Sequence, residues 1–148
     1  MKTPKKSNPM TIELIRVVLD FGLVILIWLV QLVIYPSFKF YDSINLFKFH
    51  KTYKTRVAIV VMPLMVGQLF IYSYLLIVQP TLFNILGFCT VMLLWGVTFF
   101  QFVPLHGKIS NEMISEKILN QLINRNWLRT FLWSALFTYS FYEFLLKF

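Results

Sequence analysis

Residues 82–105 read LFNILGFCTVMLLWGVTFFQFVPL and contain no charged side chain. A helix needs about 20 residues to cross the hydrocarbon core of a bilayer, so this run is long enough to span it. Comparable apolar runs occupy residues 12–35, 58–78 and 127–146. None of the four shows the alternation of apolar and polar residues that marks a membrane β-strand. The sequence therefore predicts an all-α protein, a four-helix antiparallel transmembrane bundle.

The composition also favours an integral membrane protein. Of the 148 residues, 58% are hydrophobic and 14% are charged, whereas a soluble domain has roughly 25% charged residues. The segments outside the four runs are too short to build a water-soluble core. We therefore expect residues 1–148 to form one membrane domain.

The first run begins with three charged residues, Glu13, Arg16 and Asp20. Charged side chains are costly inside a bilayer, so we expect this end of the helix to lie at the lipid headgroups. Arg16 would extend toward the phosphates, or pair with Glu13 or Asp20 at helical spacing. The run is too long for the apolar core of a signal peptide and lacks a small-residue cleavage site, which predicts an uncleaved first helix.

The distribution of basic residues predicts the orientation. Nine basic residues flank the two long connections, and five flank the termini and the short turn at residues 79–81. Basic residues prefer the cytoplasmic side, so we expect the long connections in the cytoplasm of a multi-pass protein of the bacterial inner membrane. The net charge of +8 points to anionic membrane lipids as partners, and nothing resembles a nucleic-acid-binding module.

Both long connections have helical patterns. Residues 41–53 are expected to extend the second span at its start, with Ser43 as the N-cap. Residues 110–124 carry an apolar stripe, which predicts a separate cytoplasmic amphipathic helix at the interface, capped by Ser110 and with Glu112 in its first turn. Pro63 lies inside the second span and should kink it.

Polar residues from all four runs are expected near the cytoplasmic end of the bundle. Intramembrane polar groups are costly and mark functional sites. We assign catalytic roles to His50, His106, Arg129 and Asn126. Ligand-binding roles are assigned to Gln31, Tyr35, Gln101 and the deeper Gln68.

Three interpretations of this cluster compete. Two imidazoles could ligate a metal or a haem iron, although no carboxylate accompanies them and no CxxCH or HExxH motif is present. Alternatively, a histidine could move protons while Arg129 and the amides hold an anion or a quinone-like oxygen. Third, these side chains could simply bond loop carbonyls and lipid phosphates. The sequence leaves the cofactor and the metal unknown.

Other chemistries are not favoured. The sequence has no nucleophile elbow, glycine-rich phosphate loop or paired carboxylates, so hydrolase and nucleotide-binding functions have no support. Without an internal repeat or expected buried carboxylates, alternating-access transport is also disfavoured.

Three short stretches carry a family resemblance: residues 31–36 (QLVIYP), 103–106 (VPLH) and 126–130 (NWLRT). Together they resemble the anthrone oxygenase-like family of small four-helix membrane proteins, in which V-P-L followed by Asn or His closes the third helix. In that family the fourth helix opens with W-N or N-W and then R-T. The resemblance implies a shared bundle with His106, Asn126 and Arg129 near one site. Fungal members are associated with oxygenation of anthrones, but the resemblance does not carry the substrate across.

Two functional hypotheses follow. In the first, the chain is an oxidoreductase- or oxygenase-like membrane protein acting on a lipophilic aromatic or quinone-like compound. His50 and His106 would then serve as acid–base groups or ligands, and Arg129 and Asn126 would stabilise an oxyanion. In the second, the chain is a non-catalytic accessory or structural subunit of a larger membrane complex.

Overall fold

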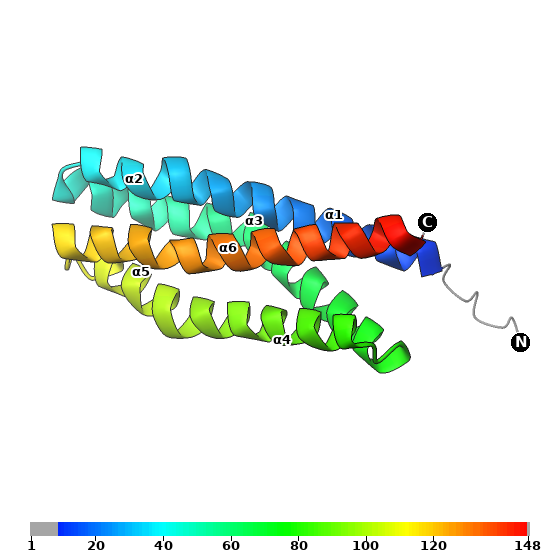
Figure 1. Cartoon of the computed structure of the whole chain (residues 1–148). Helices are drawn as coiled ribbons and strands as arrows, with labels where there is room; N and C mark the ends of the chain where they lie inside the picture. The colour runs from blue at the N-terminus through cyan, green and yellow to red at the C-terminus, as the bar shows by residue number, and fades with distance from the viewer. Residues whose placement is uncertain (1–8, 148) are drawn as a thin grey trace, which may run out of the picture.

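The computed structural model describes residues 9–147, and these residues are helical apart from short connections. They form four helical rods (Figure 1). The elements are α1 (Pro9–Leu29), η1 (Val30–Ile34), α2 (Tyr35–Ser37), η2 (Phe38–Phe40), α3 (Ser43–Val78), α4 (Leu82–Val97), η3 (Thr98–Phe102), α5 (Val103–Ser110) and α6 (Glu116–Lys147). The first rod runs from α1 to η2, the second is α3, the third joins α4, η3 and α5, and the fourth is α6. The predicted all-helical fold is therefore confirmed for the described residues.

Three of these rods are long and apolar enough to cross a membrane: Met10–Phe40, Ser43–Val78 and Leu82–Ser110. The fourth rod, α6, is 32 residues long but is less apolar, because it carries charged, amide and hydroxyl side chains through its length. Several of these, including Asn126, Arg129, Thr130 and Ser140, are buried against the other rods. Hydropathy alone therefore understates how well α6 fits the bundle.

Neighbouring rods are antiparallel. α1 packs against α6 and α3, and α4 packs against α3 and α6. The start of α1 and the end of α6 lie together at one end of the molecule (Figure 1). The opposite end holds the two long connections. α3 continues through Pro63 and changes direction about midway, as the sequence predicted (Figure 1).

The predicted helical extension before the second span is confirmed as the first part of α3, but its cap is Asp42 rather than Ser43. The Asp42 Oδ1 atom accepts hydrogen bonds from the backbone N–H groups of Ile44 (3.0 Å) and Asn45 (2.9 Å). Asp42 precedes Ile44 by two residues and Asn45 by three, which is the spacing at which an N-cap side chain accepts hydrogen bonds from the first turn. Ser43 is one residue too close to do the same. The backbone and side chain of Asn45 are the main cause of a lowered pKa of Asp42, relative to its ordinary 3.8.

The predicted separate interfacial helix at residues 110–124 is wrong. Ser110 is the last residue of α5, which ends in a turn where Glu112 adopts a left-handed conformation (φ 61°). The N–H of Met113 donates to the carbonyl of Lys108, and the N–H of Glu112 donates to that of Ile109. This is the Schellman arrangement, which ends a helix. The segment after this turn leads into α6, where Leu119 and Leu122 are buried in the bundle, whereas Met113 is exposed.

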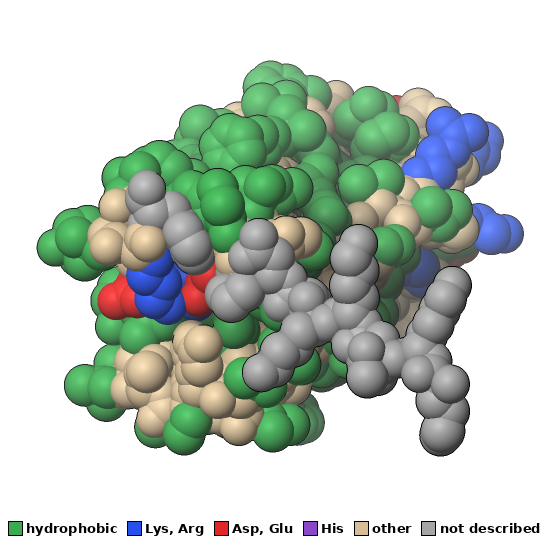
Figure 2. Space-filling view, turned by 90° about the vertical axis from the view of Figure 1, so that its right-hand side faces the viewer, with side chains coloured by type: hydrophobic (Ala, Val, Ile, Leu, Met, Phe, Trp, Pro, Cys, Tyr) green, Lys and Arg blue, Asp and Glu red, His purple; other side chains and the backbone are tan. Residues whose placement is uncertain are grey.

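The core has two parts. At the end with the long connections, Phe38, Leu46, Ile109 and Leu122 are completely buried. Toward the other end, Leu23, Met65, Val91, Leu94 and Trp133 form a second cluster. Outside these clusters, large apolar side chains cover much of the surface seen along the bundle (Figure 2). Phe70, for example, is 71% exposed. An apolar exterior around a partly polar interior is what a lipid environment requires.

Candidate functional site

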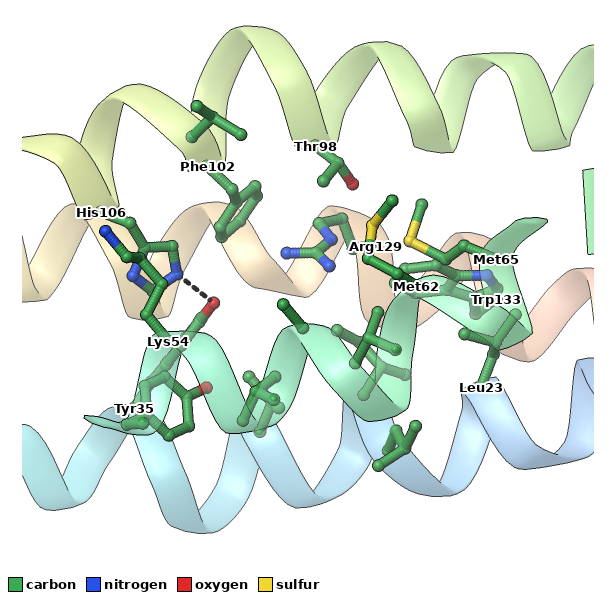
Figure 3. A pocket seen from close by; sticks show the side chains of 18 residues that line it. Leu23, Tyr35, Lys54, Met62, Met65, Thr98, Phe102, His106, Arg129 and Trp133 are labelled. Carbon is green, nitrogen blue, oxygen red and sulfur yellow. Dashed lines mark hydrogen bonds between the residues drawn. The ribbon is translucent and has the colours of Figure 1, made fainter. Parts of the chain in front are cut away.

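A cavity of about 170 Å³ lies inside the bundle. All four rods contribute to its lining, and most of the lining is apolar. Figure 3 shows Tyr35, Lys54 and His106 toward one end of it, Arg129 in the middle, and Leu23, Met65 and Trp133 toward the other. Of the polar residues predicted to converge, Tyr35, His106 and Arg129 line this cavity, and they come from three of the four rods.

Tyr35, His106 and His50 form a chain of hydrogen bonds. The Tyr35 hydroxyl lies 3.0 Å from His106 Nε2, and His106 Nδ1 lies 2.8 Å from His50 Nε2. Both links can reverse together: either the tyrosine donates and the protons point toward His50, or they all point toward the tyrosine. His50 is completely buried, and its Nδ1 atom has no partner. The chain can therefore carry a proton between the cavity and His50.

His50 does not line the cavity, because His106 lies between them. The structure therefore places His50 behind His106, where it can reach a bound molecule only through that residue. The ring of Phe38 contacts that of His50 edge to face at 6.1 Å. This ring and the surrounding core close His50 off on the side away from His106.

Two π-helical turns, η1 and η3, precede Tyr35 and His106 in the sequence. η1 ends directly before Tyr35, and η3 ends shortly before His106. Each turn is followed within two residues by a proline, Pro36 or Pro104. Proline lacks an N–H and its ring clashes with the carbonyl four residues earlier, so the preceding turn widens. A π turn rotates the residues after it about the helix axis, which is why such turns recur at functional sites.

Arg129 has an unusual environment. Its side chain is 7% exposed, and its guanidinium lies over the rings of Phe102 (4.2 Å) and Trp133 (5.1 Å). It is within electrostatic reach of Tyr35, but its Nε atom has no hydrogen-bond partner. Among the described residues, no ion pair includes Arg129, and no Asp or Glu lines the cavity. Ring contacts offset only part of the cost of burying a charge.

Sequence reasoning missed Lys54 and Tyr53, which both line the cavity. They follow His50 by four and three residues on α3, so helical spacing places all three on one face. That spacing was the signal that could have identified them. Phe102 and Trp133 were also missed, because aromatic residues are too common in this sequence to single out any one of them.

Asn126 and Gln31 are close to the site but do not line it. The Asn126 amide donates to Gln31 Oε1 (2.9 Å), and the Gln31 amide donates to the carbonyl of Ile123 (3.3 Å). These bonds tie η1 to α6. The Asn126 Oδ1 atom is buried and has no hydrogen-bond partner. Both residues therefore bridge two helices beside the cavity, near its lining residues Val30 and Arg129, and their catalytic and ligand-binding roles stay predictions.

Gln101 and Gln68 also lie outside the lining of the cavity. Gln101 is half-buried on η3 and does not line the cavity. Gln68 is buried, but it belongs to a second polar group, because its amide donates to Asp20 Oδ1 (2.7 Å) and its carbonyl accepts from the indole of Trp133 (3.3 Å). Thr98 and Phe102 are the residues of η3 that line the cavity, and Gln68 is held by Asp20 and Trp133.

The second polar group, here called the acidic clamp, contains the three charged residues that the sequence placed at the headgroups. Glu13, Arg16 and Asp20 are all buried inside the bundle, at 3%, 0% and 0% exposure. Arg16 pairs with Glu13 at 2.7 Å, and Lys147 of α6 pairs with Glu13 at 2.8 Å. Asp20 accepts from Gln68 and, at 2.7 Å, from the hydroxyl of Tyr72. The predicted pairing of Arg16 with Glu13 is confirmed. Partners on α3, α4 and α6 complete the group, so these side chains face the interior of the bundle and Arg16 does not extend away from it.

The histidines do not form a conventional metal centre. Within residues 9–147, no three side chains of the types His, Cys, Asp and Glu lie together to hold an ion. The two imidazoles face each other nitrogen to nitrogen and share a hydrogen bond. This geometry favours proton exchange among the alternatives that the sequence left open.

No known family model, curated protein or solved structure matches this chain.

Proposed function

We propose that the chain is a four-span membrane protein with its two long connections in the cytoplasm. Three rods are long and apolar enough to span, and α6 packs along α1 over its length. Its buried polar residues bond to other rods, so their hydropathy cost is compensated within the protein. The fourth rod would then cross with the other three.

Within this bundle, the cavity would bind a lipophilic aromatic or quinone-like compound and remove a proton from it. The observation that carries this proposal is the cavity itself: the hydrogen-bonded series from Tyr35 to His50 and the guanidinium of Arg129, which has no carboxylate partner among the described residues, meet inside apolar walls. A proton acceptor beside a fixed cation is the combination that forms and stabilises an oxyanion.

The steps follow from the geometry. Tyr35 and His106 line the cavity, and both nitrogens of His106 are engaged with Tyr35 and His50. The Tyr35 hydroxyl can take a proton from a bound phenol, or from a carbon next to a ring ketone, while it passes its own proton to His106 Nε2. The proton then passes along the chain toward His50. The negative charge that remains on the ligand oxygen would be held by Arg129, whose burial makes that interaction stronger than it is in water.

Such an oxyanion is the electron-rich form of an aromatic ketone that molecular oxygen attacks. For anthrone, the overall reaction consumes one O₂ and gives anthraquinone and one water. The resemblance of residues 103–106 and 126–130 to the anthrone oxygenase-like family supports this reaction class, since these segments supply His106 and Arg129. The chain would contribute proton removal and charge stabilisation.

Anthrone is a direct probe of both steps. Under argon in D₂O, NMR would follow exchange of its CH₂ hydrogens in the presence of detergent-purified protein. In air, anthraquinone formation and O₂ consumption would follow oxidation. We expect His106→Gln to slow exchange by about 10²-fold or more, and Arg129→Gln to do so by about 10²-fold. Arg125→Gln, on the exposed face of the same helix, is the matched control.

Exchange no faster than in protein-free micelles would overturn the proposal. If turnover were absent and native mass spectrometry showed stoichiometric binding to larger subunits, the chain would instead be an accessory subunit.

A further inference from the structure

The charge balance of the cavity points to a more specific ligand. Two cationic side chains, Arg129 and Lys54, line the cavity, and no carboxylate does so among the described residues. The proposed oxyanion would pair with Arg129. Lys54 has no partner in that proposal.

Lys54 lies where two cavities meet. It lines the first cavity and also a second one of about 280 Å³, which is lined by Phe47, Lys51, Lys54 and Ser110. Its ammonium group donates one hydrogen bond, to the Ser110 hydroxyl at 3.2 Å. Lys54 is exposed, and an ammonium has three donors, so two of them are open to solvent or to an anionic partner. Lys51 adds a further positive charge at the same place.

The cavity has a charged end and an apolar end, as an amphiphilic molecule does. Lys54 and Met65 both line it, and they lie 11 residues apart on α3, which is roughly 16 Å of helix. The end at Lys54 is next to the long connections, and the end at Met65 is deep in the apolar core (Figure 3). An acidic group would lie at the first end and a ring system would extend past Arg129 toward the second.

The wall of the cavity opens toward the outside between α3 and the third rod. Ala58, Met62 and Val103 line it and are also exposed on the surface. In a membrane this surface faces acyl chains, so a lipophilic molecule can enter from the bilayer without crossing water. A two-chain phospholipid does not suit a cavity of about 170 Å³, whereas a compact aromatic acid does.

We propose that the natural ligand is a lipophilic aromatic carboxylate, whose acidic group binds Lys54 while its ring oxygen lies at Arg129. This inference rests on the proposed function for the role of Arg129. It adds a carboxylate site at Lys54 and an entry route from the lipid.

The test compares two probes that differ in one group: anthracene-2-carboxylate and the neutral anthracene-2-methanol. Their intrinsic fluorescence would report binding to the full chain in a neutral detergent. We expect the carboxylate to bind more tightly than the alcohol. Lys54→Gln should weaken carboxylate binding roughly tenfold to hundredfold and leave alcohol binding unchanged. Lys48→Gln, exposed on the same helix and outside both cavities, should change neither.

Equal affinities of the two probes for the wild type, or an equal loss for both in Lys54→Gln, would overturn the carboxylate site. So would a Lys54→Gln variant that loses only bound anionic phospholipid in native mass spectrometry. The anthrone exchange assay is independent of these outcomes, because anthrone has no carboxylate. The carboxylate site can therefore fail while the proposed proton transfer stands, and failure of both assays would reject both.

Discussion

Arg16 and Arg129 are both buried and each stacks on a phenylalanine ring, at 4.5 Å from Phe83 and 4.2 Å from Phe102. Their other surroundings differ. Arg16 pairs with Glu13 and donates to Asn84 and to the carbonyl of Ser140. Arg129 has no carboxylate partner within the described chain. The protein itself supplies a carboxylate for the guanidinium of Arg16 but none for that of Arg129.

The difference separates a structural group from a binding group. Burying a charge is costly unless it is paired, so the partners of Arg16 explain how the acidic clamp holds α1, α4 and α6 together. The same cost at Arg129 is not offset by the protein alone. A cavity beside it means that a ligand can supply the missing negative charge. Four predictions test this contrast.

The largest expected effect distinguishes the two arginines by stability. Arg16→Leu should lower the free energy of unfolding by about 3–5 kcal/mol, because it leaves Glu13 and Asp20 without their buried cation. Arg129→Leu should lower it much less in the ligand-free protein, because it removes ring contacts but leaves no buried carboxylate without a partner. Unfolding in mild detergent, followed by circular dichroism, measures both. Equal losses would show that Arg129 is part of a structural pair.

A second prediction concerns the clamp at Tyr72. A Cβ atom on Gly87 would lie 2.5 Å from Cε1 of the Tyr72 ring, so Gly87→Ala must push this tyrosine away from Asp20. We expect a loss of about 1–3 kcal/mol in the free energy of unfolding. Gly96→Ala, on the same helix and with nothing within 4 Å, should be neutral or stabilising by up to about 1 kcal/mol. Similar melting temperatures for the two variants would contradict this packing.

The third prediction addresses the proton chain. Tyr35→Phe removes one hydrogen bond to His106 and should cost about 1 kcal/mol of stability. It should slow anthrone exchange while changing probe affinity little, since the aromatic ring and Arg129 remain. A loss of affinity equal to the loss in rate would mean that Tyr35 holds the ligand rather than moving protons.

The smallest effect is expected at Asp42, an exposed carboxylate at the end of the bundle with the long connections. Backbone and side-chain donors of Asn45 lower its pKa in the folded protein. Its stabilising contribution is therefore fully present above the ordinary pKa of 3.8 and is lost as the pH falls through the lower, folded value. Melting temperatures between pH 2 and 6 should converge for the wild type and Asp42→Asn only at the acidic end. A difference that is constant over this range would contradict the cap.

Local patterns in the sequence were sufficient for the helices. The uncharged run at residues 82–105 and the spacing of the other apolar runs predicted the all-α fold, the short turn at residues 79–81 and the continuation of α3 from the connection before it. They also brought Tyr35, His106 and Arg129 to one region. These features depend on hydrophobicity and helical geometry, which act within a single segment.

The tertiary structure decided which polar groups are satisfied. Glu13, Arg16 and Asp20 look like an exposed helix end in the sequence, and they are buried because partners on α3, α4 and α6 meet them. Asn126 bonds to Gln31 outside the lining of the cavity, whereas Lys54 lines it. Whether a buried charge has a partner depends on residues distant in sequence, here up to 134 positions apart between Glu13 and Lys147. Hydropathy is read along one helix, but charge compensation is a property of the packed bundle, and it is compensation that separates the clamp from the binding site.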